Sequence, residues 1–271
     1  MESFLPQTKE QTKTGDELVK VRAVPYAAGG ETFVAVVFDI EPGWHIYWQN
    51  PGDSGAAPSL EFTPTDDKGA VRYGDMPFQT TGSTRWPMPE RHESAGGILD
   101  FVYGHSVVAF VPAGGVTQSQ GRVTVGADWL VCRDVCLPGS GQARIQATPS
   151  EADLALIQAS FERLPTSAFM ANVDLRASFS EGKLNIHVPG AKQLIFFPDP
   201  SEDMVGPTDA FHEGIADADK LSLQYSHESQ NAKVISGVLE VHRADGAEAF
   251  VQVSVPGPAA SGAAEEHKGT E

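Results

Sequence analysis

The 271-residue chain contains two cysteines, Cys132 and Cys136, and their spacing limits the chemistry they can support. Disulfide-bonded residues have Cα atoms roughly 4.4–6.8 Å apart, whereas four residues of extended strand span about 13 Å. The two sulfurs can therefore pair only if residues 133–135 form a tight loop. A disulfide that closes so short a loop stabilises a fold by only about 2 kcal/mol. We therefore favour a redox-active dithiol, which opens and closes, over a structural staple.

A passive structural disulfide and a metal site are the two alternatives for this cysteine pair. Zinc usually takes four ligands, and the chain has no second cysteine pair to supply them. A dinuclear copper loop would place a histidine after the second cysteine, where this chain has Ser140. The residues 138–141, Pro-Gly-Ser-Gly, break helices, so the pair does not lead into the helix of a thioredoxin-like copper chaperone. Copper(I) held by the two thiolates stays open, but we assign no metal ligand.

Eight further side chains are candidates to cover the cysteines or to tune their pKa: Trp44, His45, Trp48, Trp86, Met88, His105, Asp128 and Trp129. The first three belong, with Tyr47, to an aromatic cluster that also fits a strand packed in the core. Trp86 and Met88 lie in a proline-rich stretch and fit a cover for the thiols or a surface for partner docking. The histidines, with His92, are also candidate bases or copper ligands. Asp53, in the sequence NPGDSG, fits a turn.

Short runs in which apolar and polar residues alternate predict the strands that must position these groups. Before residue 149 they cover residues 18–27, 31–40, 45–48, 59–62, 70–74, 98–104, 106–113, 121–132 and 141–148. After residue 166 they cover residues 183–188, 193–198, 220–226, 234–242 and 249–256. Gly29-Gly30 predicts a hairpin turn, and residues 73–97 are interpreted as a loop. The pattern is typical of antiparallel β-sandwiches.

Residues 149–165 have the pattern of a helix instead. Ser150 and Asp153 form a capping box, and Pro165 ends the segment. Apolar residues recur on one face at helical spacing: Leu154, Ile157, Phe161 and Leu164. The chain is therefore predicted to be mainly β, with two sandwiches and a linking helix. Its predicted parts are a flexible N-terminus (1–17), the first sandwich (18–148), the helix (149–166), the second sandwich (167–256) and a flexible tail (257–271).

Composition excludes several classes of protein. The formal net charge of −17 repels phosphate backbones, so we expect no nucleic-acid partner. The 27 glycines and 19 prolines disfavour a bundle of long helices, and a hydrophobic content of 41% excludes global disorder. Apolar runs such as residues 33–38 are far shorter than the roughly 20 residues that span a bilayer. The N-terminus has no signal pattern. We expect a soluble protein, or an ectodomain segment without its signal and anchor.

Four segments in the first sandwich, taken in order, resemble the N-terminal periplasmic region of DsbD-like thiol:disulfide interchange proteins. They are GWHIYWQNPGDSG (43–55), RWPMPERH (85–92), VYGHSVV (102–108) and DWLVCRDVCLPG (128–139). The likeness is greatest to the suppressor-of-copper-sensitivity branch, which has a longer N-terminal region. IFFP at residues 195–198 also resembles that longer region. The resemblance covers most of residues 18–256.

This resemblance implies immunoglobulin-like domains in the periplasm, as the ectodomain of an inner-membrane protein. Cys132 and Cys136 would be the exchanging pair of a protein-disulfide reductase that needs no cofactor. Electrons would come from transmembrane and thioredoxin-like domains of the same full-length protein and pass to periplasmic thioredoxin-fold proteins. By likeness to the better-known branch, whose cysteines are farther apart in sequence, Cys136 is the attacking sulfur. The alternative function is copper binding by the same cysteines, for copper tolerance, and the second sandwich is expected to be an interaction or spacer module.

Overall fold

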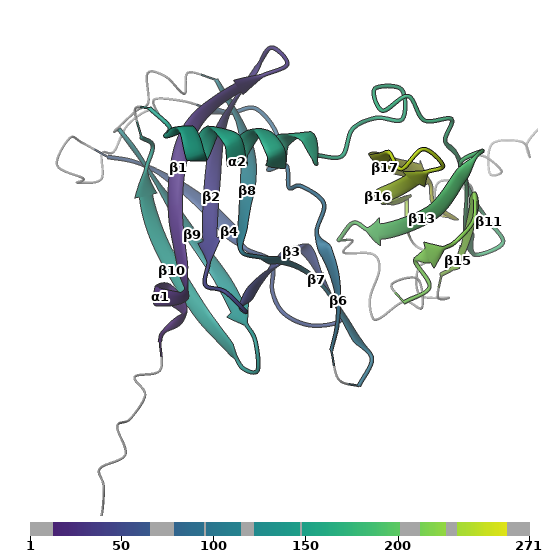
Figure 1. Ribbon diagram of the computed structural model, residues 1–271, viewed down its shortest axis with the longest axis horizontal. Helices are drawn as coiled ribbons and strands as arrows, with labels where there is room; N and C mark the ends of the chain where they lie inside the picture. Colours follow the sequence, from purple (N-terminus) through teal and green to yellow (C-terminus); the bar gives the residue numbers. More distant parts are fainter. Residues whose placement is uncertain are drawn as a thin grey trace, which may run out of the picture.

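The computed structural model describes residues 13–65, 79–94, 96–114, 122–146, 148–200, 212–225 and 232–258. In this part the chain folds mainly into antiparallel strands, which build two β-sandwiches joined through a helix (Figure 1). The fold class predicted from alternation and turn residues is therefore confirmed. We call the sandwich built by strands within residues 19–144 domain 1, and the one built within residues 176–256 domain 2.

Domain 1 has two sheets packed face to face. Its strands are β1 (Val19–Ala28), β2 (Glu31–Ile40), β3 (His45–Gly52), β4 (Ser59–Pro64), β5 (Gln79–Thr80), β6 (Glu90–Ser94), β7 (Ile98–Gly104), β8 (Ser106–Gly114), β9 (Val123–Cys132) and β10 (Cys136–Arg144). The first sheet has the order β1-β2-β8-β5, and the second has the order β10-β9-β3-β7-β6 with β4 beside β9. Every second residue of the central strands faces inward, so the core lies between the sheets.

Two stretches of domain 1 differ from the sequence-based prediction. The loop expected over residues 73–97 contains β6, which pairs with β7. Its sequence, ERHES, is almost wholly polar because β6 is an edge strand, so no apolar alternation marks it. The strand expected over residues 141–148 is β10, which begins at Cys136 and includes Pro138 and two glycines. An edge strand tolerates proline, since its N–H side needs no partner. The strand predicted over residues 70–74 lies outside the described residues.

The helix α2 (Glu151–Glu162) begins at Ser150 with the predicted capping box. The Ser150 hydroxyl accepts the backbone N–H of Asp153, and the Asp153 carboxylate accepts the backbone N–H of Ser150. The same carboxylate accepts a hydrogen bond of 2.8 Å from the guanidinium of Arg22 in β1. The start of the helix is therefore closed by its own cap and tied to domain 1 by an ion pair.

The apolar face of α2 lies across the outer face of the first sheet, over β1, β2 and β8 (Figure 1). Ile157 and Leu164 are buried there, and Phe161 packs against them. Leu154, expected on the same face, is 44% exposed instead. The buried face of the helix runs through Asp153, Ile157 and Ser160, so Leu154 lies beside this face and not on it.

The N-terminal segment expected to be flexible lies mostly outside the described residues. Its last part forms a short helix, α1 (Gly15–Leu18), which contacts β10. Leu18 is buried, and the Asp16 carboxylate accepts the backbone N–H of Ser140 at 2.6 Å. Residues 13–18 thus belong to the folded body of domain 1. Of the expected tail, residues 257 and 258 are described.

Domain 2 has strands β11 (Arg176–Ser180), β12 (Lys183–His187), β13 (Ala191–Pro198), β14 (Ile215–Ala216), β15 (Lys220–Gln224), β16 (Val234–Arg243) and β17 (Glu248–Pro256). They form one sheet of order β11-β12-β15 and another of order β14-β13-β16-β17. The inward side chains, among them Phe196 and Leu239, form a separate core. The other face of the second sheet meets domain 1, where the ring centroid of Phe197 lies 5.2 Å from that of Phe101 and 6.2 Å from that of Trp48.

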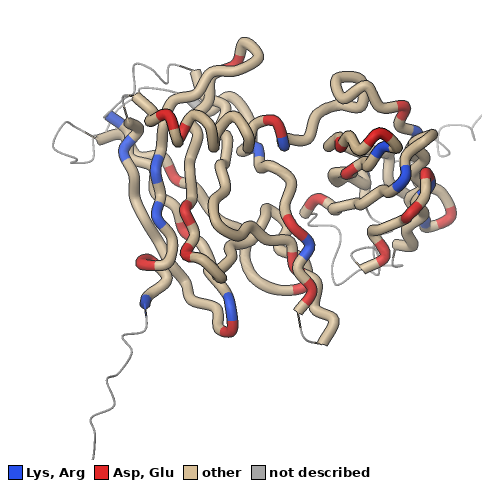
Figure 2. Tube along the Cα trace, viewed as in Figure 1, with Lys and Arg blue, Asp and Glu red and all other residues tan. Residues whose placement is uncertain are grey.

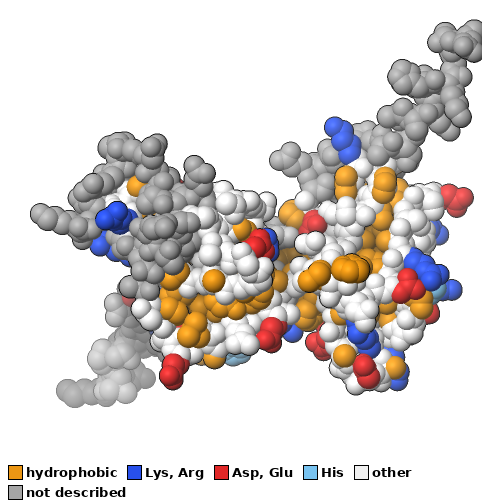
Figure 3. All heavy atoms as spheres, turned by 90° about the horizontal axis from the view of Figure 1, so that it is seen from above, with side chains coloured by type: hydrophobic (Ala, Val, Ile, Leu, Met, Phe, Trp, Pro, Cys, Tyr) orange, Lys and Arg blue, Asp and Glu red, His pale blue; other side chains and the backbone are white. Residues whose placement is uncertain are grey.

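The surface carries scattered charge on both domains (Figure 2) and patches of exposed hydrophobic side chains (Figure 3). Phe169 and Met170, in the connection between α2 and β11, are 90% and 74% exposed. Within the described ranges, no helix has the length and apolar character required to cross a membrane.

Candidate redox site

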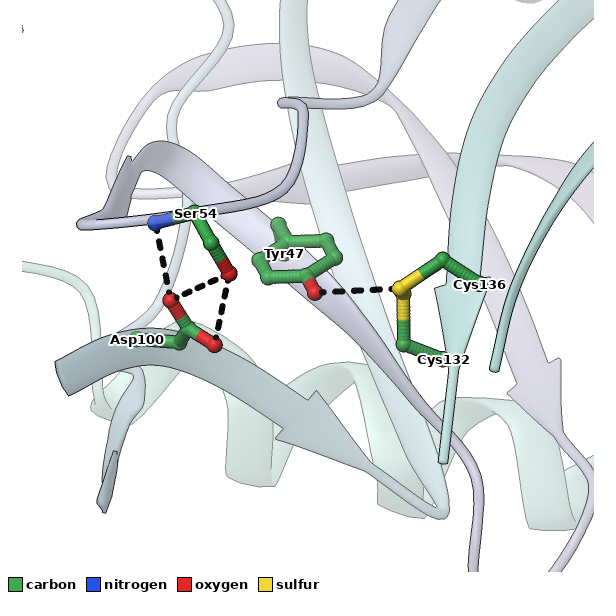
Figure 4. The surroundings of a disulfide bond; sticks show 5 residues. All are labelled: Tyr47, Ser54, Asp100, Cys132 and Cys136. Atoms are coloured by element: carbon green, nitrogen blue, oxygen red, sulfur yellow. Dashed lines mark hydrogen bonds between the residues drawn. A yellow bond between two sulfur atoms is a disulfide. The ribbon is translucent and has the colours of Figure 1, made fainter. Parts of the chain in front are cut away.

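The two cysteines face each other across the β9–β10 hairpin. Cys132 ends β9, Cys136 begins β10, and the two are direct cross-strand partners joined by a disulfide, with their Cα atoms 4.2 Å apart (Figure 4). Arg133, Asp134 and Val135 form the loop, in which the Arg133 N–H donates to the Val135 carbonyl at 3.2 Å. The tight loop that the spacing required is therefore confirmed.

The two sulfur-bearing residues differ in exposure. Cys132 is 2% exposed and packs with Leu130, Tyr47 and Val102 on the outer face of the second sheet. Cys136 is exposed, and Val135 at the tip of the loop is 57% exposed. A macromolecular partner can therefore approach the residue Cys136, while Cys132 is sheltered behind it.

Tyr47 is the polar neighbour of the exposed cysteine. Its hydroxyl lies 3.8 Å from the Cys136 Sγ, while the residue as a whole is only 1% exposed (Figure 4). Burial raises the pKa of Tyr47, and the negative charge of Asp100 raises it further. The phenol therefore keeps its proton at neutral pH. After reduction of the disulfide, it can donate a hydrogen bond to a thiolate at Cys136.

The loop after β3 covers the Tyr47 ring. Asp100 accepts hydrogen bonds from the backbone N–H of Ser54 at 3.0 Å and from its hydroxyl at 2.9 Å (Figure 4). Gly55 then approaches so closely that a Cβ there would overlap the Tyr47 ring, and its φ of 86° also favours glycine. The predicted turn at Asp53 is part of this loop, since Asp53 exchanges backbone and side-chain hydrogen bonds with Leu99.

His45 lies beside the buried cysteine. It is the cross-strand neighbour of Cys132, and its ring centroid lies 5.5 Å from that of Tyr47 and 5.2 Å from that of His92. Burial lowers the pKa of His45, the nearby His92 lowers it further, and Asp100 acts in the opposite direction. His45 is therefore a neutral imidazole at neutral pH, able to accept a proton but not to stabilise a thiolate by positive charge.

Arg133, the first loop residue, has its charge engaged locally. Its guanidinium lies 4.8 Å from the centroid of the Trp44 ring and donates to the Asp134 carboxylate at 3.0 Å. A basic and an acidic position accordingly lie side by side at the tip of the hairpin (Figure 2). Trp44 thus contacts the cysteine loop through Arg133.

The other candidate side chains lie elsewhere. Trp48, Trp86, Met88 and Trp129 are buried between the two sheets, in a core cluster distinct from the one that holds Cys132. Trp86, for example, stacks on Tyr103 with ring centroids 6.0 Å apart.

Asp128 and His105 are both exposed. Asp128 lies four residues before Cys132 on β9, beside Ser59. His105 lies in the turn between β7 and β8 with a φ of 60°. Asp100 and Ser54 were not among the candidates, and Tyr47 was considered only as a member of the aromatic cluster. Alternation along β3 would have placed Tyr47 on the His45 face, opposite to Trp48.

The described side chains include one group with ligand atoms close enough to share a metal ion, and it lies in domain 2. Glu240, His242 and Glu248 have ligand atoms within 4.8 Å of one another on β16 and β17. The imidazole lies between the carboxylates, with Nε2 2.9 Å from Glu240 and Nδ1 3.7 Å from Glu248. Copper binding at the cysteines stays a prediction.

A β-sandwich that carries a two-cysteine hairpin on an outer sheet face, with one cysteine exposed and the other sheltered, defines domain 1 as a disulfide-bearing sandwich domain. Residues 14–147, which include all the strands of this domain, match the family described as thiol:disulfide interchange protein DsbD, N-terminal. Domain 1 therefore belongs to this family, and the resemblance seen in the sequence motifs is confirmed.

Among solved structures, the chain is similar to the N-terminal periplasmic domain of ScsB from Proteus mirabilis. The TM-score is 0.57 at 16% identity, over 88% of this chain and 92% of that chain, so both domains share its fold. The N-terminal domain of DsbD from Neisseria meningitidis, in the reduced form, matches with a TM-score of 0.28 at 16% identity, over 47% and 86% of the two chains. Its complex with the PilB N-terminal domain matches with a TM-score of 0.27 at 20% identity, over 52% and 86%. No curated protein sequence matches the chain.

Proposed function

We propose that domain 1 is an electron relay that reduces disulfides in other proteins through Cys132 and Cys136. The observation that carries this proposal is the unequal exposure of the two bonded cysteines. Thiol–disulfide exchange needs an accessible sulfur that attacks and a second sulfur close by that resolves the mixed disulfide. The hairpin provides both, and the family of domain 1 is one of thiol:disulfide interchange proteins.

The exchange involves two displacements at sulfur. The thiolate of Cys136 attacks one sulfur of the partner's disulfide, and the other partner sulfur leaves as a thiolate. The thiolate of Cys132 then attacks the Cys136 Sγ, which reforms the disulfide and releases the partner's second thiolate. Two electrons pass to the partner, whose two thiolates take up two protons, the same number that the two cysteines release. A donor dithiol reverses these steps and restores the reduced hairpin.

Two neighbours assist this chemistry at different sulfurs. The Tyr47 hydroxyl, 3.8 Å from the Cys136 Sγ, stabilises the attacking thiolate as a hydrogen-bond donor. His45, the cross-strand neighbour of Cys132, accepts the proton of the resolving thiol as a neutral base. Trp44 acts indirectly, because it holds Arg133 at the start of the loop.

The proposed setting is the periplasm, where the chain is the ectodomain of an inner-membrane protein. The electrons come from a thioredoxin-like domain served by a transmembrane domain of the same full-length protein, and they pass to periplasmic thioredoxin-fold proteins. The family of domain 1 and the periplasmic location of the similar ScsB domain support this setting.

Trapping with single-cysteine variants tests the proposal. Cys132→Ser keeps the exposed thiol and removes the resolving one, so it should accumulate a mixed disulfide with an oxidised thioredoxin-fold protein. Cys136→Ser, the matched control, keeps only the sheltered thiol and should give at least tenfold less adduct, measured by non-reducing gel and mass spectrometry. Equal trapping by both variants would contradict the assignment of roles. A midpoint well below about −300 mV, without exchange with any thioredoxin-fold protein, would indicate a structural disulfide.

A further inference from the structure

Domain 2 holds the strand that carries Tyr47 just beyond the disulfide site. In β3, the residues that follow Tyr47 and Trp48 form hydrogen bonds with domain 2. The Asn50 side chain is buried, and its amide donates to the Pro198 carbonyl at the end of β13 at 2.8 Å. Its side-chain oxygen accepts the backbone N–H of Gly52 at 3.1 Å. Asn50 thus connects domain 2 to Gly52, the last residue of β3, directly before the loop that covers Tyr47.

A second contact reaches the loop itself. The Asp53 carboxylate, whose side chain is 15% exposed, accepts the backbone N–H of Leu99 at 2.8 Å and lies 2.8 Å from the His212 Nε2 of domain 2. The next two residues of the loop are Ser54, bonded to Asp100, and Gly55, which packs on the Tyr47 ring. Contacts with domain 2 therefore lie within two residues of the loop's contact with Tyr47.

We propose that domain 2 is a positioning element for the disulfide site: Pro198 holds the end of β3, His212 holds the loop that follows it, and this loop fixes the Tyr47 hydroxyl beside Cys136. The proposal rests on the relay function proposed above and gives domain 2 a part in it. A neutral hydroxyl that points at a thiolate stabilises the reduced form of the hairpin. When the loop loosens, Tyr47 gains freedom, the thiolate loses that hydrogen bond, and the disulfide becomes harder to reduce.

The test compares substitutions at His212 in the whole chain. His212→Glu places a carboxylate against Asp53 and should push the loop away. We expect the equilibrium constant for reduction of the disulfide by dithiothreitol to fall about threefold, which corresponds to roughly 14 mV. The pH at which iodoacetamide alkylates Cys136 at half its maximal rate should rise. His212→Gln keeps a side-chain donor and should restore the wild-type values.

Two further variants calibrate the result. Tyr47→Phe removes the hydroxyl directly and should move both readouts in the same direction, by as much as His212→Glu or more. His187→Ala breaks another histidine–aspartate pair of domain 2, with His187 3.4 Å from Asp219, and should leave both readouts unchanged. The proposal is overturned if His212→Glu and His187→Ala behave alike, or if Tyr47→Phe has no effect.

The dithiothreitol equilibrium separates this proposal from the relay function. It is measurable even if no thioredoxin-fold protein exchanges with the hairpin, so failure of the relay leaves the test intact. Conversely, normal trapping of a partner together with an unchanged equilibrium in His212→Glu would overturn the positioning role alone. Thermal unfolding should be used to check that each variant is folded. Because the His212 side chain is exposed, we expect the substitutions there to leave the fold intact.

Discussion

At the scale of the residue, the site depends on how differently two bonded cysteines and two nearby polar groups are placed. Cys132 is sheltered, Cys136 is exposed, Tyr47 faces the exposed sulfur and His45 is the strand neighbour of the sheltered one. The cysteine spacing predicted the loop from bond geometry alone. The residues around it were harder to predict, because Asp100 and Ser54 come from separate parts of the chain and meet only through the pairing of β3 with β7.

The lowered pKa of His45 predicts a pH-dependent term in stability. Burial and His92 hold the pKa of the folded group below the ordinary value of 6.5, so the unfolded chain binds more protons as pH falls through that value. The term is fully present above about pH 6.5 and is lost as pH falls toward the pKa of the folded state. His45→Gln should flatten this part of the profile, measured by urea unfolding at a series of pH values. His105→Gln, a change at an exposed histidine, should not, and an unaltered slope in His45→Gln would contradict the argument.

At the scale of the element, the hairpin and the loop after β3 form the two sides of the site. Most strands could be predicted because they bury apolar side chains, as β2 and β7 do with the predicted bounds. Two edge strands could not be predicted with their bounds: β6 is polar, and β10 contains Pro138 and glycines that close packing requires. A Cβ at Gly139, for instance, would overlap Trp129 and Gly15. Sequence alternation thus reports burial, and it fails where an element has little to bury.

A pair of glycine substitutions tests how tightly the loop covers Tyr47. Gly55 and Gly30 have similar φ angles of 86° and 82°, so alanine costs each about 1–2 kcal/mol in backbone strain. A Cβ at Gly30 has no heavy atom within 4 Å, whereas one at Gly55 overlaps the Tyr47 ring. Gly55→Ala should therefore cost about 1–3 kcal/mol more than Gly30→Ala in the free energy of unfolding. It should also change the alkylation rate of Cys136, and equal effects of the two variants would show that the loop does not press on the ring.

At the scale of the whole molecule, the two sandwiches share an interface in which β13 has two apolar faces. Phe196 points into the core of domain 2, and Phe197 packs with the core residues Trp48 and Phe101 of domain 1. The run IFFP predicted a strand, but a strand with both faces buried gives no alternation from which a partner domain could be inferred. The role of domain 2 therefore could not be predicted from its own sequence, which indicates strands and contains no cysteine.

Alanine substitutions at the two phenylalanines should separate the stability of domain 2 from its coupling to domain 1. Truncation of either buried ring to alanine should lower the free energy of unfolding by about 3–5 kcal/mol. Phe197→Ala should also weaken amide hydrogen-exchange protection around Trp48 and Phe101, because it removes their neighbour in domain 2. Phe196→Ala, the control, should lower protection within domain 2 and leave these amides unchanged. Equal loss of protection around Trp48 in both variants would mean that the interface depends on domain 2 as a whole.

The pairing of β9 with β10 continues from Leu137 to Arg144, beyond the cysteines. Opening the sulfur–sulfur bond thus frees a three-residue loop at most, while the ladder of backbone hydrogen bonds keeps both strands in place. The oxidised and reduced proteins can therefore present almost the same surface to a partner protein. Electron transfer by the proposed exchange would therefore require no slow refolding step. The direction of electron transfer would be set by the reduction potentials of the two proteins.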